Sequence, residues 1–342
     1  MKKTLKTIAA TAAAAALAAA LMLTGCSQPV TDASASSGAA EAGTAASEEA
    51  AAQADALRIG SLKGPTSVGL ASMMAQGQGE FTVAASADEI APKLAQGELD
   101  IALVPANLAA TLYQKTDGGI RVLDVNTLGV LYAVSAADVQ GVANLRGRTV
   151  YMTGKGTVPE YTVRAVLDAS GVTPEEVDVQ FRSEPTEVAA LIAQEPESVG
   201  ILPQPFATSA TLKNETLQQR IDLTAAWEEA TGGDRGSLIT GVTIATADTV
   251  DVKREAIDEF IARHEASAAV AQADPDRIAA EVVALGIIDN EQIAKAAIPK
   301  CNVVCLTGAE MESALAGYLD VLFQLDPAAV GGALPGEEFY LK

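Results

Sequence analysis

The sequence predicts an α/β fold made of two similar lobes, and three features of its pattern lead to this prediction. Short apolar segments alternate with amphipathic ones from Leu57 to about Ser135, as they do where parallel strands are joined by helices. The same alternation starts again after about Ala136. A strand–Lys-Gly–Thr–helix string at 62–66 also returns, as strand–Gly-Lys-Gly-Thr–helix, at 152–157. We therefore expect two lobes, each with a mostly parallel sheet flanked by helices.

The first half of the folded region is expected to hold four strands separated by helices. Its predicted strands are 57–62, 80–85, 99–105 and 120–126. The third of these is almost wholly apolar, which is typical of a strand covered on both faces. It ends in Leu103-Val104-Pro105-Ala106-Asn107, a string with a counterpart at Ile201-Leu202-Pro203-Gln204-Pro205 in the second half.

The second half predicts strands at 148–152, 177–181 and 198–202, and then an extended run at 237–245. The rest of the chain is mostly helical, with candidate helices at 254–271, 276–285, 291–297 and 309–325. Because this tail has no strand series of its own, we expect it to complete the first lobe. Lobe 1 would then comprise 56–136 and 238–342, and lobe 2 would comprise 137–237. Two extended crossovers between two lobes form a hinge.

The N-terminus has the pattern of a secretory signal peptide, predicted at 1–25. Three lysines precede an alanine-rich apolar run that ends in Leu23-Thr24-Gly25-Cys26. This Leu-x-Gly-Cys string resembles the bacterial lipobox, which implies cleavage before Cys26 and lipidation of that residue. The alternative is a transmembrane anchor, but few flanking residues resemble a stop-transfer signal. Residues 26–55 contain almost no large apolar side chain, so we expect a disordered tether.

The charge balance excludes some partner classes. The formal net charge is -21, and removal of the first 25 residues, which carry three lysines and no acid, makes it about -24. A surface this acidic disfavours nucleic acid and anionic lipid head groups. It does not exclude a small anionic ligand, because a few backbone N–H groups can make a single pocket favour negative charge.

Two cysteines remain after Cys26, and they are Cys301 and Cys305. An extended strand would hold their Cα atoms about 13 Å apart, beyond bridging range, so a disulfide between them requires a turn. The bridged and free forms both stay open. We expect no metal site, because His264 is the one histidine of the chain and there is no second cysteine pair.

The loop after the first strand, Lys63-Gly64-Pro65-Thr66-Ser67, is a candidate binding element. A strand, a glycine-containing turn and a helix start place backbone N–H groups at the carboxyl edge of a sheet, where open α/β folds hold their ligands. Taken alone, the loop is equally an ordinary connection with a solvated lysine. Its counterpart at 154–157 strengthens the binding interpretation, because two such loops from two lobes can face each other across a hinge.

These strings together resemble the substrate-binding proteins of bacterial ABC importers, of the nitrate/sulfonate/taurine and thiamine-precursor type. The resemblance rests on the lipobox, on Lys63-Gly64-Pro65-Thr66, on Asp100-Ile101-Ala102 leading to Asn107, and on Leu145-Arg146-Gly147-Arg148-Thr149-Val150. It continues with the string 154–161 and with Leu202-Pro203-Gln204-Pro205. It implies the type II periplasmic-binding fold, with a ligand between the lobes and closure around it.

The resemblance also implies which loops touch the ligand. The implied contacts are Gly64, Pro65, Thr66, Ser67, Asn107 and Thr127 from lobe 1, and Thr153, Gly154, Lys155, Gly156, Thr157, Gln204 and Phe206 from lobe 2. Glycines let a ligand approach the backbone, and hydroxyls and amides supply oriented hydrogen bonds. Thr66, Thr157 and Asn107 are also plausible helix caps, and Lys155 is also a plausible solvated side chain.

Two enzyme classes share this fold: menaquinone-pathway enzymes that act on chorismate-derived substrates, and thiamine-pyrimidine enzymes. A signal peptide and lipid anchor argue against both. The string 154–157 lacks the spacing of a nucleotide P-loop, which excludes an NTPase. We expect His264 to be a surface or half-buried residue of a lobe 1 helix.

The function expected from the sequence is therefore an exported, lipid-anchored binding protein without enzymatic activity or cofactor. It would act as a monomer on the outer face of the cytoplasmic membrane, or in the periplasm of a two-membrane cell. Its expected partners are a small organic ligand and an ABC permease with its ATPase. A sensing or scaffolding lipoprotein without transport is the alternative. The ligand, whether sulfonate, carboxylate or thiamine-type pyrimidine, stays open.

Overall fold

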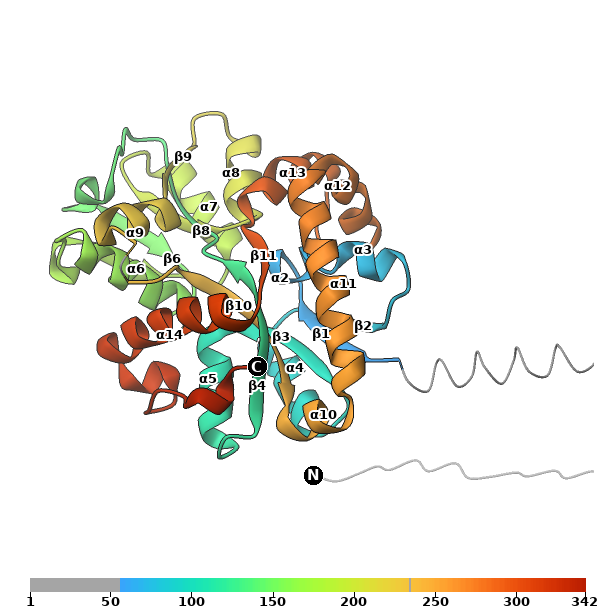
Figure 1. The fold of residues 1–342 in the computed structure, drawn as a ribbon. Coiled ribbons are helices and arrows are strands. Elements are labelled where there is room, and N and C mark those ends of the chain that lie inside the picture. Colours follow the sequence, from blue (N-terminus) through green and yellow to red (C-terminus); the bar gives the residue numbers. More distant parts are fainter. Residues whose placement is uncertain (1–55, 234) are drawn as a thin grey trace, which may run out of the picture. The chain divides into compact units, whose positions relative to one another are not determined.

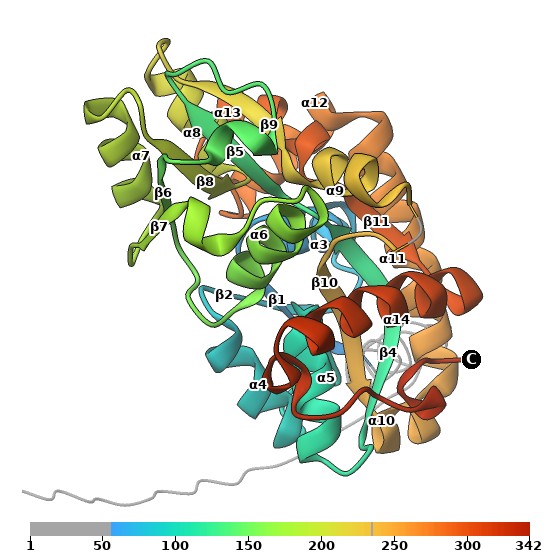
Figure 2. The same cartoon turned by 90° about the vertical axis from the view of Figure 1, so that its left-hand side faces the viewer.

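The computed structural model describes residues 56–233 and 235–342. The predicted signal peptide, the lipidation site Cys26 and the whole of the predicted tether lie outside these residues. Figures 1 and 2 show two β-sheets flanked by helices, which confirms the predicted α/β class. No helix within the described ranges is both long enough and apolar enough to span a membrane.

The six-stranded sheet has the order β11-β4-β10-β3-β1-β2. Its strands are β1 (Arg58–Leu62), β2 (Glu80–Ala84), β3 (Ile101–Pro105), β4 (Ile120–Leu128), β10 (Ile239–Thr246) and β11 (Val303–Leu306). β1 pairs in parallel with β2 and β3. β10 lies between β3 and β4 and runs antiparallel to both. The sheet is therefore mixed rather than mostly parallel, because a strand that arrives from elsewhere in the chain is inserted into the parallel series.

The five-stranded sheet has the order β7-β6-β8-β5-β9. Its strands are β5 (Leu131–Ser135), β6 (Thr149–Met152), β7 (Asp178–Phe181), β8 (Val199–Pro203) and β9 (Gln218–Asp222). β6 pairs in parallel with β7 and β8, and β5 pairs antiparallel with β8 and β9. The first crossover between the sheets therefore leads directly from β4 into β5, which is a full strand of this sheet.

The two sheets repeat one plan. In the order β2-β1-β3-β10-β4 and the order β7-β6-β8-β5-β9, an inserted antiparallel strand separates the third strand from the fourth. The inserted strand is the one that follows a crossover from the other sheet. We call the six-stranded sheet with α2–α5 and α10–α14 the first lobe, and the five-stranded sheet with α6–α9 the second lobe. The exact lobe boundaries stay a prediction.

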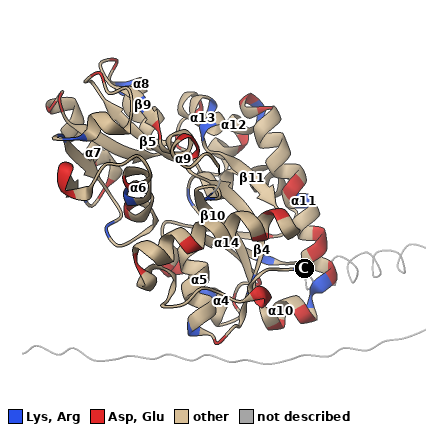
Figure 3. Cartoon of the chain, turned by 60° about the vertical axis from the view of Figure 1, so that its left-hand side comes forward, with Lys and Arg blue, Asp and Glu red and all other residues tan. Residues whose placement is uncertain are grey.

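The helices cover both sheets. Their bounds are α2 (Pro65–Val68), α3 (Ala71–Ala75), α4 (Ala87–Ala95), α5 (Ala106–Lys115), α6 (Val158–Ala169), α7 (Pro185–Gln194), α8 (Phe206–Lys213), α9 (Leu223–Thr231), α10 (Ala247–Val252), α11 (Arg254–Ala273), α12 (Pro275–Ala284), α13 (Glu291–Ala297) and α14 (Gly308–Leu325). Short 3₁₀ turns include η3 (Ile298–Lys300) and η4 (Pro327–Val330). Acidic residues are spread over outer helices such as α10, α11 and α14 (Figure 3), in keeping with the negative net charge.

Local signals explain several helix ends. α4 starts with a capping box between Ser86 and Glu89, which satisfies two N–H groups that the helix leaves free. α9 starts at Asp222, whose carboxylate accepts hydrogen bonds from two backbone N–H groups, and ends at Gly232 in the left-handed conformation. Trp227 on this helix is fully buried and donates a hydrogen bond from Nε1 to the Gly236 carbonyl at 2.7 Å.

Side chains also join the lobes beyond the two crossovers. Helix α14 of the first lobe packs against α6 of the second. There the Tyr161 hydroxyl donates to the Asp326 carboxylate at 3.0 Å, and the Thr162 and Tyr318 hydroxyls lie 3.3 Å apart. On another contact, the Lys300 ammonium donates to the Gln219 side chain at 2.9 Å.

One prediction about the fold is wrong. His264 is fully buried, and its Nδ1 atom lies 3.1 Å from an Asp124 carboxylate oxygen. The apolar face of α11 turns toward the six-stranded sheet and carries the histidine with it, although the neighbouring residues Arg263 and Glu265 are exposed. In the sequence, a histidine flanked by charged residues resembles a surface position. Its burial follows only from its place on the helix face that packs against the sheet.

Candidate functional site

A cavity of about 460 Å³ lies between the two lobes, where both crossovers pass. It is lined by the start of α4, by the start of α5 and by both crossover segments. The start of α6 and the end of β8 close it on the side of the second lobe. The lining residues are Ala87, Asp88, Pro105, Asn107, Leu108, Thr111, Gly129, Val130, Leu131, Thr157, Val158, Pro159, Thr162, Pro203, Leu238, Ile239 and Thr240.

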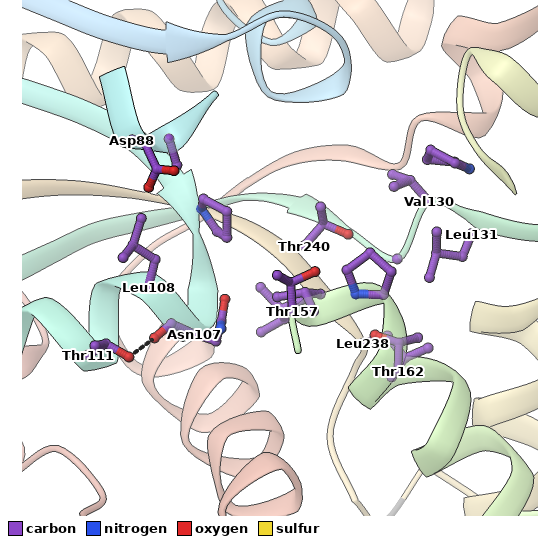
Figure 4. Close-up of a pocket in the computed structure, with 17 residues that line it drawn as sticks. Asp88, Asn107, Leu108, Thr111, Val130, Leu131, Thr157, Thr162, Leu238 and Thr240 are labelled. Carbon is purple, nitrogen blue, oxygen red and sulfur yellow. Dashed lines mark hydrogen bonds between the residues drawn. The ribbon is translucent and has the colours of Figure 1, made fainter. Parts of the chain in front are cut away.

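Two helix starts from opposite lobes border this cavity (Figure 4). α5 begins directly after Pro105, the last residue of β3, and α6 begins directly after Thr157. Neither start has a side-chain cap that accepts from its N–H groups. The first turn of a helix leaves backbone N–H groups without intrahelical partners and carries a partial positive charge. The two starts therefore favour an electronegative group in the cavity.

The polar side chains of the cavity are an amide and several hydroxyls. Asn107 is half-buried, and its backbone carbonyl accepts a hydrogen bond from the Thr111 hydroxyl at 2.9 Å (dashed in Figure 4). Its side-chain amide makes no hydrogen bond to another described residue, which leaves it available to a ligand. Thr157 is exposed, and its hydroxyl donates to the Gly154 carbonyl at 2.7 Å. Thr157 also lines the cavity, and its hydroxyl oxygen can still accept a hydrogen bond.

The remainder of the lining is mostly apolar. Within the described ranges, Asp88 is the one ionisable side chain among the lining residues. It is exposed and lies in the first turn of α4. A single carboxylate with amide and hydroxyl groups can bind and orient a molecule.

The family of the chain follows from its sequence. The sequence model of the menaquinone biosynthesis family matches residues 57–299, which is most of the chain. The chain belongs to the menaquinone biosynthesis family. A search of curated proteins returned no match.

Solved structures resemble this member of the menaquinone biosynthesis family in fold. An ABC transporter protein from Parabacteroides distasonis is 23% identical with a TM-score of 0.72, and the match covers 84% of this chain and 99% of the other. The periplasmic aliphatic sulphonate binding protein of Escherichia coli is 14% identical with a TM-score of 0.66, covering 84% and 92%. The alkanesulfonate-binding protein of Xanthomonas axonopodis pv. citri, bound to MOPS, is 14% identical with a TM-score of 0.56, covering 82% and 94%. At these identities the likeness shows the periplasmic-binding-protein fold.

The structure brings two of the predicted contact residues, Asn107 and Thr157, to the cavity of this family member. They come from non-equivalent parts of the two lobes, the loop after β3 and the loop after β6, and both border the same cavity (Figure 4). The predicted loop 64–67 is not among the lining residues. Ser67 is fully buried and Thr66 is 7% exposed, and both hydroxyls donate to the Leu62 carbonyl, at 2.6 and 2.9 Å.

The other predicted contacts lie near the cavity or inside a lobe, and their role in binding stays a prediction. Thr127 is fully buried and donates to the Asn126 side chain at 2.9 Å. Gln204 is buried and accepts from Thr208 at 2.8 Å, whereas Phe206 is 37% exposed. Lys155 lies with its ammonium 5.7 Å from the centre of the Phe181 ring. Thr153, Gly154 and Gly156 belong to the same loop as Lys155, next to Thr157.

Sequence reasoning missed the apolar wall of the cavity, to which Leu108, Val158 and Leu238 contribute. These side chains look like ordinary core residues in the sequence. The signal that could have found some of them is position: Gly129–Leu131 and Leu238–Thr240 are the crossover segments themselves, and a cleft between two lobes must pass them. Cys301 and Cys305, the cysteines of the described residues, have free thiols; Cys301 is buried and Cys305 is half-buried.

Proposed function

We propose that this protein is an exported, lipid-anchored solute-binding protein. It captures a small organic molecule in the cavity between the lobes and presents it to an ABC permease driven by an ATPase. The observation that carries the proposal is the origin of the lining: both lobes and both crossovers contribute to one cavity. A ligand there touches two bodies joined by a hinge, so it stabilises the closed arrangement to the extent that it binds that arrangement more tightly.

The N-terminal pattern supports export. A basic start, an apolar run and Leu-x-Gly-Cys at Cys26 are typical of a lipoprotein precursor. The neighbours in fold include proteins named as periplasmic binding proteins, which agrees with this location. A lipid anchor followed by the segment 27–55 would keep the binding domain next to a membrane permease.

The lining supports a ligand with an apolar body and one polar end. Leucine, valine, isoleucine and proline side chains supply most of the wall, while Asn107, Thr157 and two helix starts supply hydrogen bonds. Within the described ranges, neither lysine nor arginine lines the cavity, and Asp88 does. A multiply charged anion would meet this carboxylate without a cationic partner. We therefore favour a neutral molecule or a single carboxylate or sulfonate held by the helix starts.

An enzyme of the menaquinone biosynthesis family is the second candidate, and the match over residues 57–299 favours it. It would need a catalytic group in the cavity. Asp88 is the one ionisable group available there among the described residues, and it is exposed.

Thermal unfolding of the purified full chain, with a panel of aliphatic sulfonates, aromatic carboxylates and aminopyrimidines, tests the two candidates together. A binder should gain thermal stability with one compound class, which mass spectrometry then recovers unchanged. Asn107→Ala should reduce the gain by weakening binding about 10-fold, roughly the effect of one hydrogen bond to a ligand. Conversion of the stabilising compound into a product would support the enzyme and contradict the binder.

A further inference from the structure

A buried group of three metal-ligating side chains lies in the first lobe, separate from the cavity. Asp124 on β4 and His264 on α11 are fully buried, and Cys305 on β11 is half-buried. The His264 Nδ1 atom lies 3.1 Å from Asp124 Oδ2 and 3.8 Å from the Cys305 sulfur. One ligand atom from each residue lies within 4.8 Å of the other two. Three different elements of the lobe thus meet at one point.

The charge of this cluster calls for a cation. Of the ion pairs among the described residues, the one that involves Asp124 is with His264, which is neutral unless protonated. A carboxylate without solvent access is costly when no positive charge compensates it. A divalent ion together with the Asp124 carboxylate and a Cys305 thiolate would have no net charge. An uncharged group of this kind has the lowest desolvation cost in a buried site.

Two of the three separations in the cluster are close to those of tetrahedral coordination by zinc. Zinc lies about 2.0–2.1 Å from nitrogen or oxygen ligands and about 2.3 Å from sulfur. At a tetrahedral angle these lengths place N and O about 3.3 Å apart, and N and S about 3.6 Å apart. The corresponding separations here are 3.1 and 3.8 Å. The lengths also rule out a catalytic Cys–His–Asp triad, because Asp124 and Cys305 approach the same ring nitrogen.

The local backbone is shaped to bring the three groups together. β11 pairs with β4 through Val303 and Leu306, with a register shift between them that includes Cys305. β10 pairs with β4 with another shift between Thr243 and Ile244, next to Asp124. Bulges of this kind re-aim side chains.

The carboxylate of Asp124 is also held in place. The Thr243 hydroxyl donates to Asp124 Oδ1 at 2.7 Å, which leaves Oδ2 toward His264. The Asn126 side-chain amide in turn donates to the Thr243 hydroxyl at 3.2 Å. Partners that orient a ligating carboxylate in this way are typical of metal sites.

We propose that Asp124, His264 and Cys305 form a binding site for Zn²⁺. The ion would bind Asp124 Oδ2, His264 Nδ1 and the Cys305 sulfur, and would tie α11 and β11 to β4. On binding, the thiol loses its proton to solvent, and the imidazole keeps a single proton on Nε2 rather than Nδ1. One proton is thus released for each ion bound, apart from any from a fourth ligand.

The thiol must be deprotonated by the ion rather than beforehand. Burial, together with the negative charges of Asp124 and Glu265, raises the pKa of the Cys305 thiol far above its ordinary value. Because Cys305 is half-buried, it also offers the side from which an ion can enter.

Titration of the metal-free full chain with Co²⁺, a spectroscopic substitute for Zn²⁺, tests the proposal. We expect a thiolate-to-cobalt absorption band that saturates at one ion per chain and disappears on addition of Zn²⁺. Cys305→Ser should abolish the band. Cys301→Ser is the matched control, since Cys301 is the neighbouring buried thiol and donates to the Ala297 carbonyl, and this variant should keep the band.

Thr243→Val tests the positioning role of the hydroxyl and should weaken Zn²⁺ binding about 10- to 100-fold. Circular dichroism checks that each variant is folded, and Cys305→Ala replaces Cys305→Ser if the latter is not. Absence of the band in the unmodified chain would overturn the site. So would a band of equal strength in the Cys305 variant, which would assign the ion to Cys26 or to the surface.

Discussion

The loops that follow β1 and β6 hold the same place in two similar sheets, yet their surroundings differ. In the first lobe, Ser67 is fully buried, and its hydroxyl lies 2.6 Å from that of Ser61. In the second lobe, Thr157 is exposed and borders the cavity. The difference lies in what covers each loop. α2 packs against β3, β4 and β11, and a Cβ at Gly241 on β10 would lie 2.9 Å from the Thr66 methyl group.

The comparison teaches that a repeated strand–loop–helix string fixes a position in the sheet but not its exposure. The first lobe has an extra strand, β11, and the additional helices α11–α13, which close over its loop. The second lobe has no counterpart of β11 within its five-stranded sheet. The cavity lining is therefore drawn from unequal parts of the two lobes: the start of α5 in one and the start of α6 in the other.

A second difference appears where the third strand of each sheet begins. In the first lobe Asp100 is 3% exposed and accepts hydrogen bonds from Arg58 and from the Lys253 ammonium, the latter at 3.0 Å. In the second lobe the equivalent residue is Ser198, whose hydroxyl donates to the Glu195 carbonyl at 2.7 Å. At this point the first lobe is held by hydrogen bonds between charged side chains, and the second lobe by a hydrogen bond between neutral groups.

The largest effect is expected from closing the cavity on the side of the first lobe. Asn107→Trp places an indole ring into a space of about 460 Å³. Ligand binding should weaken by at least about 100-fold, or roughly 2.7 kcal/mol. Folding should be retained, because Asn107 is only half-buried and makes no side-chain hydrogen bond to the described residues. Unchanged affinity by calorimetry would place the ligand elsewhere.

The next largest effect is a loss of stability when the charged hydrogen bonds of Asp100 in the first lobe are removed. Asp100→Asn removes a buried carboxylate from two cationic partners and should cost about 2–3 kcal/mol of unfolding free energy near pH 7. Ser198→Ala is the matched change in the second lobe and should cost about 1 kcal/mol. Chemical denaturation of both variants measures this difference, and equal losses would contradict it.

The same carboxylate predicts a pH dependence. Burial alone would raise the pKa of Asp100, but the hydrogen bonds from Arg58 and Lys253 outweigh it and lower the pKa to about 2. A lowered pKa gives stability that is present above the ordinary pKa of about 3.9 and is lost as the pH falls toward 2. The stability difference between the unmodified chain and Asp100→Asn should therefore shrink over this window. A difference that stays constant down to pH 2 would contradict the assignment.

Ser67→Ala should act on stability alone. It removes a buried hydroxyl from Ser61 and from the Leu62 carbonyl, which should cost about 1–2 kcal/mol. Ligand affinity should not change, because the residue does not line the cavity. A loss of affinity without loss of stability would show that the predicted loop does contact the ligand.

Thr157→Ala should have the smallest effect. In contrast to Ser67→Ala, it should weaken ligand binding and leave stability almost unchanged. Stability should change by no more than about 0.5 kcal/mol, because the hydroxyl is exposed. Affinity should fall about 5- to 10-fold through loss of one hydrogen bond. Calorimetry and denaturation on the same sample separate the two effects, and a stability loss without an affinity loss would make Thr157 a structural residue.

The sequence was sufficient to predict the two-lobed α/β class, since strands such as β3 and β8 are short, apolar and bounded by proline. It did not predict the antiparallel position of β10, because pairing partners are set by tertiary contacts and not by the strand's own residues. β11 was missed because it stands alone between the predicted helices 291–297 and 309–325, outside any alternating series of strands and helices. Within the cavity, Asn107 and Thr157 could be anticipated as polar residues after a strand, whereas Leu108 and Leu238 look like any core residue.

The buried cluster was missed for a related reason. Asp124 stands inside an otherwise apolar strand, and Cys305 and His264 are separated from it by long stretches of chain. Nothing in their spacing resembles a metal motif. Only the packing of α11 and β11 against β4 brings them together.

Native mass spectrometry of the full chain purified from its own host tests the central claim most directly. The account predicts one small organic molecule bound per chain in the unmodified protein, released unchanged on denaturation and absent from Asn107→Trp. The same bound mass in both proteins, or a bound molecule that the protein converts into a product, would contradict a solute-binding role for the cavity between the lobes.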